Sequence, residues 1–318
     1  MKKAVTSGEK SSVRFRAWAF GVKTDLINHR KYRKDRFVID RRKDCYKKDY
    51  LSIAVIAKNE GKYIKEFIEF HLLSGVERVY FFDNASTDNT REILTPYIDS
   101  GVVVYFYFPG PKMQFPAYRR AVRYSKKVTK WLALIDADEF LFSPQGDLKK
   151  VLNEFEGQAG IGVNWVSFGP SGHEKSPKGL VIENYKETFQ DKDHLFNRHI
   201  KSIVNPKMIE SINSPHYCRY KSGRLAVDEN HEPIGIGEFG TRGERFAFTE
   251  HNNCEKLRIN HYITKSYEDL QNKGKRGYPD GMPNNVFEES MKRFEVPLKE
   301  DEAILRFVPL LKEKLNAY

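Results

Sequence analysis

The sequence predicts an α/β protein with a mostly parallel central sheet that helices flank. Two observations carry this prediction. Between residues 51 and 140, short apolar runs alternate with segments of helical periodicity, an order typical of parallel sheets. The run at 51–57 is apolar on both of its faces, as expected for a central parallel strand.

Taken in order, the chain should become ordered near Tyr50. We predict strands at 51–57, 79–82, 102–108, 131–135, 161–168 and 258–262. The segments at 195–204 and 215–220 are predicted to be further strands or irregular pieces. Helices are predicted near 64–72, around Ile93, near 117–127 and over 286–315, and residues 227–249 are predicted to form a long loop. These elements suggest three parts, a basic leader at 1–48, a central domain at 49–280 and a helical extension at 281–318.

Acidic residues follow three of the predicted strands. Glu60 follows the first, Asp83 and Asp88 follow the second, and residues 136–139, of which three are acidic, follow the strand at 131–135. The carboxyl ends of parallel strands meet at one edge of a sheet, where open α/β proteins bind ligands. In an extended or gently turned chain Asp136 and Asp138 would point the same way and could share one divalent cation. The alternative is that these acids merely form a polar turn.

The net charge of +11 is concentrated near the N-terminus. Residues 1–50 hold 16 Lys and Arg against 6 Asp and Glu, whereas the other 268 residues hold 38 against 37. A nucleic-acid-binding domain usually carries its positive charge on the folded surface, so this distribution argues against nucleic acid as a partner. Phe15, Trp18 and Phe20 lie among the cations, which suits contact with an anionic membrane surface. The alternative is a solvated leader that packs partly on the domain.

The remaining composition is that of a globular protein. The chain has 318 residues, and 40% of them are hydrophobic, enough for a sizeable core. It has neither an apolar run of about 18 residues nor a signal-like apolar stretch. Its three cysteines lack metal-site spacing, which fits a reducing compartment. We therefore expect a cytoplasmic protein, peripheral on the inner membrane face if the leader binds lipid.

Four motifs together resemble the GT-A glycosyltransferases, and most closely their family-92 or family-2-like branch, which includes galactosyltransferases. They are Ala57-Lys58-Asn59-Glu60, Asp83-Asn84-Ala85-Ser86-Thr87-Asp88, Asp136-Ala137-Asp138-Glu139-Phe140, and Asn260-His261-Tyr262 with Lys265-Ser266. The resemblance covers about residues 51–277. It implies a Rossmann-like GT-A domain at 49–280 and an inverting transfer from a UDP-sugar, with galactose as a candidate, to a glycan or glycolipid acceptor. It also implies a Mn²⁺ or Mg²⁺ ion held by the DxD-like acids.

The chemistry suggests a role for each candidate residue. A divalent ion would stabilise the charge that grows on the leaving diphosphate. Asp138 is the leading candidate for its direct ligand, with Asp136 on the ribose or bound through water, and His261 as a late donor or as a core residue. The other proposed donor-binding residues are Lys58, Asn59, Glu60, Asp83, Asn84, Asp88, Arg119, Lys265, Lys273 and Arg276.

An inverting transfer also needs a carboxylate that accepts the proton of the acceptor hydroxyl. Glu174, in the loop after the strand at 161–168, is our first choice, and Asp193, Asp228 and Glu238 are alternatives. Two other functional classes remain open. A nucleotidyltransferase would use the same acids, but it usually has a Gly-rich phosphate loop that Lys58-Asn59-Glu60-Gly61 does not resemble. A non-enzymatic binding protein would depend on the basic leader alone.

Overall fold

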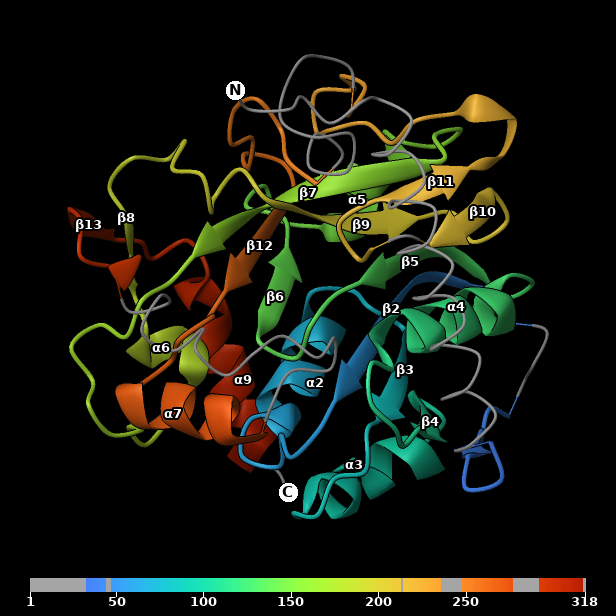
Figure 1. The fold of residues 1–318 in the computed structure, drawn as a ribbon, viewed down its shortest axis with the longest axis horizontal. Coiled ribbons are helices and arrows are strands. Elements are labelled where there is room, and N and C mark those ends of the chain that lie inside the picture. Colours follow the sequence, from blue (N-terminus) through green and yellow to red (C-terminus); the bar gives the residue numbers. More distant parts are fainter. Residues whose placement is uncertain (1–32, 44–46, 213, 236–246, 277–291, 317–318) are drawn as a thin grey trace, which may run out of the picture.

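The computed structural model describes residues 33–43, 47–212, 214–235, 247–276 and 292–316. At its centre lies a nine-stranded sheet with the order β1-β4-β3-β2-β5-β9-β7-β12-β6 (Figure 1). Its strands are β1 (Phe37–Ile39), β2 (Asp49–Ala57), β3 (Arg78–Asp83), β4 (Val103–Tyr107), β5 (Thr129–Leu134), β6 (Glu139–Phe142), β7 (Gly160–Ser167), β9 (Ile200–Val204) and β12 (Arg258–His261). Two small antiparallel sheets pair β10 (Ile209–Ile212) with β11 (Cys218–Tyr220), and β8 (Glu187–Phe189) with β13 (Leu298–Glu300).

Four neighbouring strands of the sheet are parallel, and β1 is antiparallel beside them at the edge. Strands β4, β3, β2 and β5 run in one direction, so their carboxyl ends share one edge. Beyond β5 the sheet is mixed, because β9 is antiparallel to both β5 and β7, while β7 and β12 are parallel and β6 is antiparallel to β12. The predicted α/β class with a parallel central sheet is confirmed.

Helices cover both faces of the sheet, as the two-sided apolar pattern of β2 requires. Ile53 and Val55 point into a core with α2 (Ile64–Leu73), α3 (Thr90–Asp99) and α5 (Leu148–Asn153), whereas Ala54 and Ile56 point into a core with α4 (Gln114–Ser125). Successive side chains of a strand face opposite ways. Burial on both sides therefore holds β2 at the centre of the fold.

A third core joins the C-terminal part of the chain to the sheet. Here α6 (Val181–Asn184) and α9 (Val308–Asn316) pack with Phe140 and Phe142 of β6. The prediction of a continuous helix over 286–315 is wrong for Leu298–Glu300, which pairs with β8 as strand β13. Its portion at 286–291 lies outside the described residues. Backbone pairing with a neighbouring strand overrides a helical periodicity that has no packed face to support it.

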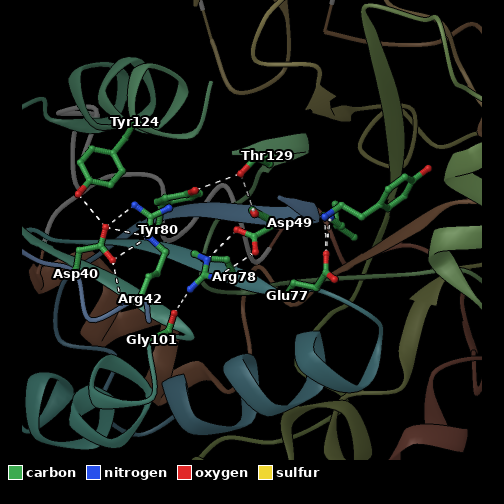
Figure 2. A network of polar contacts seen from close by, with 12 residues as sticks. Asp40, Arg42, Asp49, Glu77, Arg78, Tyr80, Gly101, Tyr124 and Thr129 are labelled. Atoms are coloured by element: carbon green, nitrogen blue, oxygen red, sulfur yellow. Dashed lines mark hydrogen bonds and ion pairs between the residues drawn. The ribbon is translucent and has the colours of Figure 1, made fainter. Parts of the chain in front are cut away.

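The sheet begins earlier in the chain than predicted. Residues Phe37–Ile39 form β1 and pair with β4 at the edge of the sheet, so the expected start of order near Tyr50 is wrong. Figure 2 shows why this segment is held. Asp40 accepts hydrogen bonds from Arg42 Nε (2.9 Å) and from the Tyr124 hydroxyl of α4 (2.9 Å). Residues 41 and 42 also pack against Gly101, where an added Cβ would lie 3.1 Å from the Arg41 oxygen.

The same network fixes the start of β2 to its neighbours. Arg78 of β3 binds both oxygens of Asp49, from Nε at 2.8 Å and from Nη2 at 3.1 Å (Figure 2). Arg78 also donates to the carbonyl of Gly101. Since a two-pronged guanidinium–carboxylate pair is both strong and directional, it sets the register at the amino end of the parallel strands, opposite the edge where the acids lie.

Two further observations concern membrane-spanning helices and cysteines. In the parts of the chain that the structure describes, no helix is long and apolar enough to cross a membrane. Cys218 and Cys254 are free thiols, whereas Cys45 lies outside the described residues. The predicted leader falls largely on undescribed residues, so its membrane contact stays a prediction.

Candidate active site

The acidic motif lies in the turn that joins β5 to β6, at the shared carboxyl edge of the parallel strands. Ile135 donates to the Ala54 carbonyl (3.2 Å), which continues the pairing of β5 with β2. The backbone N–H of Asp136 donates to Glu139 Oε2 (3.0 Å), and Glu139 N–H donates to the Asp136 carbonyl (3.2 Å). These reciprocal bonds close the turn and place both aspartates at the edge where α/β sheets bind ligands.

Asp138 is a buried carboxylate between a lysine and a histidine. Its Oδ2 accepts a hydrogen bond from Lys273 Nζ of α7 (Tyr267–Arg276) at 2.6 Å, and its Oδ1 lies 3.7 Å from His261 Nε2. Lys273 also donates to the Ile263 carbonyl (3.2 Å). Although burial alone would raise the pKa of Asp138, the positive charges, first that of Lys273, hold it well below the usual range. Asp138 is therefore ionised at neutral pH.

His261 is buried but faces the acidic turn. It ends β12, whose neighbours are β7 and β6, and its ring packs against Trp165 with 4.3 Å between centroids. Burial lowers the pKa of His261 to about 3, so the imidazole is neutral, the form that binds metals. Its Nδ1 is buried without a hydrogen-bond partner. The ring is buried as a core residue would be, and its role as a metal donor stays a prediction.

Asp136 has a different set of partners. Its Oδ2 accepts from Lys201 Nζ of β9 (2.6 Å), and its Oδ1 accepts from the Tyr118 hydroxyl (3.1 Å) and from Gln114 Nε2 (3.2 Å), both on α4. Asp136 and Asp138 therefore have different partners, whereas their common direction in a gently turned chain stays a prediction. Among the described residues, no three His, Cys, Asp or Glu side chains converge on a possible metal position.

The third acidic residue of the motif, Glu139, lies inside the fold. Glu139 is fully buried, and its Oε1 lies 3.4 Å from Lys201 Nζ. Burial raises the pKa of Glu139 well above its ordinary value. The pKa of Lys201 is raised as well, since the nearby carboxylates, first Asp136, outweigh the effect of its burial. Lys201 is thus a charged ammonium inside the protein.

Comparison with known proteins adds to this geometry. The model of the family described as Glycosyltransferase family 92 matches residues 51–235, more than half of the chain. The chain belongs to glycosyltransferase family 92. It is 29% identical over 197 residues to a family 92 protein of Ricinus communis and 30% identical over 185 residues to one of Oryza sativa subsp. japonica. These alignments cover 59% and 56% of this chain, but only 35% and 31% of the relatives, so the chain spans about a third of their length.

Solved structures with a similar arrangement include TarS of S. aureus in complex with UDP-GlcNAc, with a TM-score of 0.40 and 12% identity over 77% of this chain and 71% of that one. A mannosyltransferase from Pyrobaculum calidifontis in complex with GDP-Man and Mn²⁺ has a TM-score of 0.31 and 17% identity, over 48% and 45% of the two chains. Family 92 membership confirms the predicted resemblance, and with it the GT-A fold class.

The family 92 match includes the two loops that follow β2 and β3, and the structure ties these loops together. Asn59, in a left-handed conformation with φ of 55°, accepts at Oδ1 from Thr87 N–H (2.7 Å), and its own N–H donates to Ser86 Oγ (2.9 Å). Asp88 accepts from Gly61 N–H (2.9 Å) and Thr90 N–H (3.0 Å). The predicted convergence of the loops after β2 and β3 is therefore present, and Asn59 and Asp88 are the residues that join them.

The other predicted nucleotide-binding side chains in these loops also serve the local structure. Asp83 is buried and accepts from the Tyr105 hydroxyl (2.5 Å) and Ser86 N–H (2.7 Å). Asn84 Nδ2 donates to the carbonyls of Phe108 (3.0 Å) and Gly110 (2.9 Å). Glu60 is buried, and its carbonyl accepts from the N–H groups of Tyr63 and Ile64 at the start of α2. These residues shape the loops, and their contact with a nucleotide stays a prediction.

The predicted donor-binding cations differ in burial and in the elements that carry them. Lys265 is buried in a left-handed conformation, with Nζ 4.7 Å from the centre of the Tyr63 ring, and it contributes to the low pKa of Asp138. Lys58 is half-buried directly after β2, and Arg119 is exposed on α4. Arg276 ends α7, and its side chain lies outside the described part.

Glu174 lies exposed in the loop after β7, and its carbonyl accepts from Glu268 N–H (3.0 Å) in the first turn of α7. This contact brings its loop beside the helix that supplies Lys273. Among the alternative bases, Asp193 binds Asn252 N–H (2.7 Å), and Asp228 binds Asn253 Nδ2 (2.9 Å). Glu238 lies outside the described residues.

Sequence inspection missed several residues around the turn. Lys201 carried a signal, because it is a lone cation inside the apolar run Ile200–Val204. Trp165, His199 and His216 also surround the site, with ring centroids of Trp165 and His199 4.7 Å apart and those of His199 and His216 4.5 Å apart. The two histidines had no motif to mark them, because they lie 17 residues apart in sequence and meet Trp165 only in the folded protein.

Proposed function

We propose that this protein transfers a sugar from a UDP-sugar, with galactose as the candidate sugar, to a glycan or glycolipid acceptor, with inversion and with the help of Mn²⁺ or Mg²⁺. The observation that carries the proposal is the pairing of Asp138 and His261 at the carboxyl edge of the parallel sheet. An ionised carboxylate and a neutral imidazole face each other there, with 3.7 Å between Oδ1 and Nε2. Membership of family 92 supports glycosyl transfer as the reaction class.

The two side chains fit a divalent ion. The 3.7 Å between Asp138 Oδ1 and His261 Nε2 is longer than a hydrogen bond. Two ligand atoms that each lie about 2.1 Å from one ion are roughly 3–4 Å apart. Mg²⁺ in particular is usually bound by one or two carboxylates together with substrate phosphates and water, so two donors from the protein suffice. When bound, such an ion would stabilise the negative charge of the leaving diphosphate.

The cations beside Asp138 suit an anionic donor. Lys273 and Lys265 bring two positive charges to the acidic turn, and Lys273 has a partly exposed side chain. Ammonium groups are common ligands of phosphate oxygens. We assign the diphosphate to this side of the turn, with Arg276 as a further candidate, and the nucleoside to the loops that contain Lys58, Asn59, Glu60, Asp83 and Asn84.

Inversion requires a base that approaches the acceptor hydroxyl from the side opposite the diphosphate. We propose Glu174 for this role, because its loop contacts the first turn of α7 and its carboxylate is solvent-exposed. Glu174→Gln should then lower kcat for transfer while leaving UDP affinity within about threefold, since the base does not bind the nucleotide. Equal loss of both would assign Glu174 to donor binding.

One further proposal concerns a part of the chain outside this site, and another concerns a different use of the same acids. The basic leader, with Phe15, Trp18 and Phe20, is proposed to hold the protein at an anionic membrane surface. A nucleotidyltransferase remains the alternative use of the acids, and it is distinguished by release of pyrophosphate from a nucleoside triphosphate. Family 92 membership favours glycosyl transfer over that reaction.

A screen of nucleotide sugars tests the proposal. Each donor is added with Mn²⁺ or with EDTA, and both donor hydrolysis and the melting temperature are recorded. We expect UDP-sugars to raise the melting temperature only with the metal and at least one to be hydrolysed. Stabilisation by nucleoside triphosphates with pyrophosphate release would favour the nucleotidyltransferase instead.

A further inference from the structure

Lys201 is a cation in an unusual place. It is the second residue of β9, its side chain is 1% exposed, and both Ile200 and Ile203 of the same strand are buried. Burying an unpaired ammonium costs several kcal/mol, so a lysine in this position requires close partners. The sheet supplies them from a strand end that is 65 residues away in sequence.

The sheet directs Lys201 toward the acidic turn. Lys201 pairs in register with Val163, and Trp165, two residues further along β7, points to the same face, as does His261 of β12. On that face, Lys201 Nζ lies 2.6 Å from Asp136 Oδ2, 3.4 Å from Glu139 Oε1 and 5.8 Å from the centre of the Trp165 ring. The ammonium thus lies between the first and third carboxylates of the motif.

The two aspartates differ in what surrounds them. Asp136 accepts three hydrogen bonds, from Lys201, Tyr118 and Gln114. Asp138 accepts one from Lys273 and leaves Oδ1 facing His261. The cation at Asp136 is enclosed, with a side chain 1% exposed, whereas Lys273 is 21% exposed. The aspartate side chains themselves are 32% exposed at Asp136 and 10% exposed at Asp138. The pairs therefore differ in their cations, because the charge at Asp136 is fixed inside the protein, whereas a ligand can reach the charge at Asp138.

We propose that Lys201 is a permanent internal counter-ion that takes the place of a metal at Asp136, so that Asp136 positions the turn and Asp138 is the only aspartate of the motif that binds the donor's ion. This inference rests on the proposed function for its second half. Held by Lys201, the Asp136 backbone keeps its bonds to Glu139. Those bonds fix the turn in which Asp138 faces His261. Lys201 is accordingly a positioning residue.

The first arm of the test measures the pair without any metal. Urea unfolding is followed for the full chain, for Lys201→Met, for Asp136→Asn and for the double variant. Lys130→Met, which removes a half-buried strand lysine paired with Glu156 at 3.8 Å, is the control. We expect Lys201→Met and Asp136→Asn each to raise the equilibrium constant of unfolding at least tenfold. The unfolding constant of the double variant should be at least tenfold lower than the product of the two single effects predicts. Additive effects within threefold would overturn the pairing.

The second arm measures Mn²⁺ affinity in the presence of UDP. Asp136→Asn should change the Mn²⁺ dissociation constant by less than about threefold, whereas Asp138→Asn should raise it at least tenfold. In Lys201→Met, Asp136 is released, so the further change of Asp136→Asn should then alter Mn²⁺ affinity at least fivefold. A tenfold loss of Mn²⁺ affinity in Asp136→Asn alone would overturn the proposal.

The test gives a result even if Lys201→Met does not fold or if the unchanged protein binds no Mn²⁺. Asp136→Asn keeps Lys201, so the metal arm gives a result even if Lys201→Met does not fold. If the unchanged protein binds no Mn²⁺, the proposed metal-dependent transfer fails, while the unfolding cycle still decides whether Lys201 is the counter-ion of Asp136. The two failures are therefore distinguishable.

Discussion

Lys273 Nζ of α7 lies 2.6 Å from Oδ2 of Asp138, a residue 135 positions earlier in the chain. This contact ties a helix outside the family-matched stretch to the acidic turn inside it. α7 is held at its other end as well, since Asp269 accepts hydrogen bonds from the Tyr63 hydroxyl (2.6 Å) and from Ser266 Oγ (2.6 Å). The loop after β2, the acidic turn and α7 therefore form one structural unit.

A first prediction follows from that contact. Lys273→Met removes a positive charge from the proposed diphosphate position, and we expect UDP affinity in Mn²⁺ to fall at least tenfold by calorimetry. Lys275→Met, an exposed lysine on the same helix, is the matched control and should stay within threefold. Equal effects of the two changes would mean that Lys273 acts only through the general charge of the helix.

A second prediction separates the two roles of His261. His261→Ala should weaken Mn²⁺ binding more than tenfold, because the ion loses one of two protein donors. Some loss of stability is also expected, on the order of 1–3 kcal/mol, since the ring packs on Trp165. If the folded variant keeps its Mn²⁺ affinity at low temperature, His261 is a core residue only.

A third prediction concerns the N-terminal boundary. Removing residues 1–32 should leave the fold intact, whereas removing 1–48 also deletes β1 and the Asp40–Arg42 contacts with Tyr124. We expect the longer deletion to lower the free energy of unfolding by several kcal/mol, measured in urea. The boundary at residue 48 therefore needs revision if the two deletions differ in this way. Equal stability of both truncated proteins would show that the β1 segment contributes nothing.

A fourth prediction concerns acid stability. His71 donates from Nδ1 to the Phe67 carbonyl (2.8 Å) and accepts from Leu141 N–H (3.1 Å), and burial lowers its pKa to about 3. The unfolded chain, with a histidine pKa near 6.5, binds the proton more readily, so stability falls as the pH decreases from about 6.5 toward 3. The expected loss is about 2 kcal/mol at pH 5 for this one group. Urea unfolding at pH 7 and pH 5 measures it.

His71→Gln serves as the comparison for acid stability. Gln cannot titrate, so its loss of stability between pH 7 and pH 5 should be smaller than that of the unchanged protein by about 2 kcal/mol. Buried His199, His216 and His261, whose pKa values burial also lowers, to about 2, about 3 and about 3, would contribute to the remaining loss. Identical pH profiles in both proteins would contradict the assignment for His71.

The sequence was most informative where a strand is apolar and its end is polar. The apolar run at 51–57 predicted a parallel strand, and the acids at 136–139 predicted a turn at the carboxyl edge of the parallel strands, where the structure places them. Segments with mixed signals were misjudged. Residues Phe37–Ile39 lie among cations and are too short to stand out, yet β4 pairs with them at the edge of the sheet.

Side-chain partners were harder to predict than elements. Asp83 and Asp88 look like ligand-binding acids in sequence, but the first bonds with Tyr105 and the second joins two loops. Asp136 and Asp138 look equivalent, although a lysine from β9 meets one and a lysine from α7 meets the other. Such partners depend on which distant strands and helices become neighbours, and the local pattern holds no information on that.

The central claim is that Asp138 and His261 hold the divalent ion of a UDP-sugar donor, and calorimetric titration of UDP tests it most directly. The titration is run with Mn²⁺ and with EDTA, on the unchanged protein and on Asp138→Asn, with melting curves recorded on the same samples. We expect UDP to bind only with Mn²⁺ and to add about 2.7 kcal/mol of stability at 100 times its dissociation constant, while folded Asp138→Asn shows neither effect. Equal UDP binding with Mn²⁺ and with EDTA, or unchanged binding in Asp138→Asn, would contradict the claim.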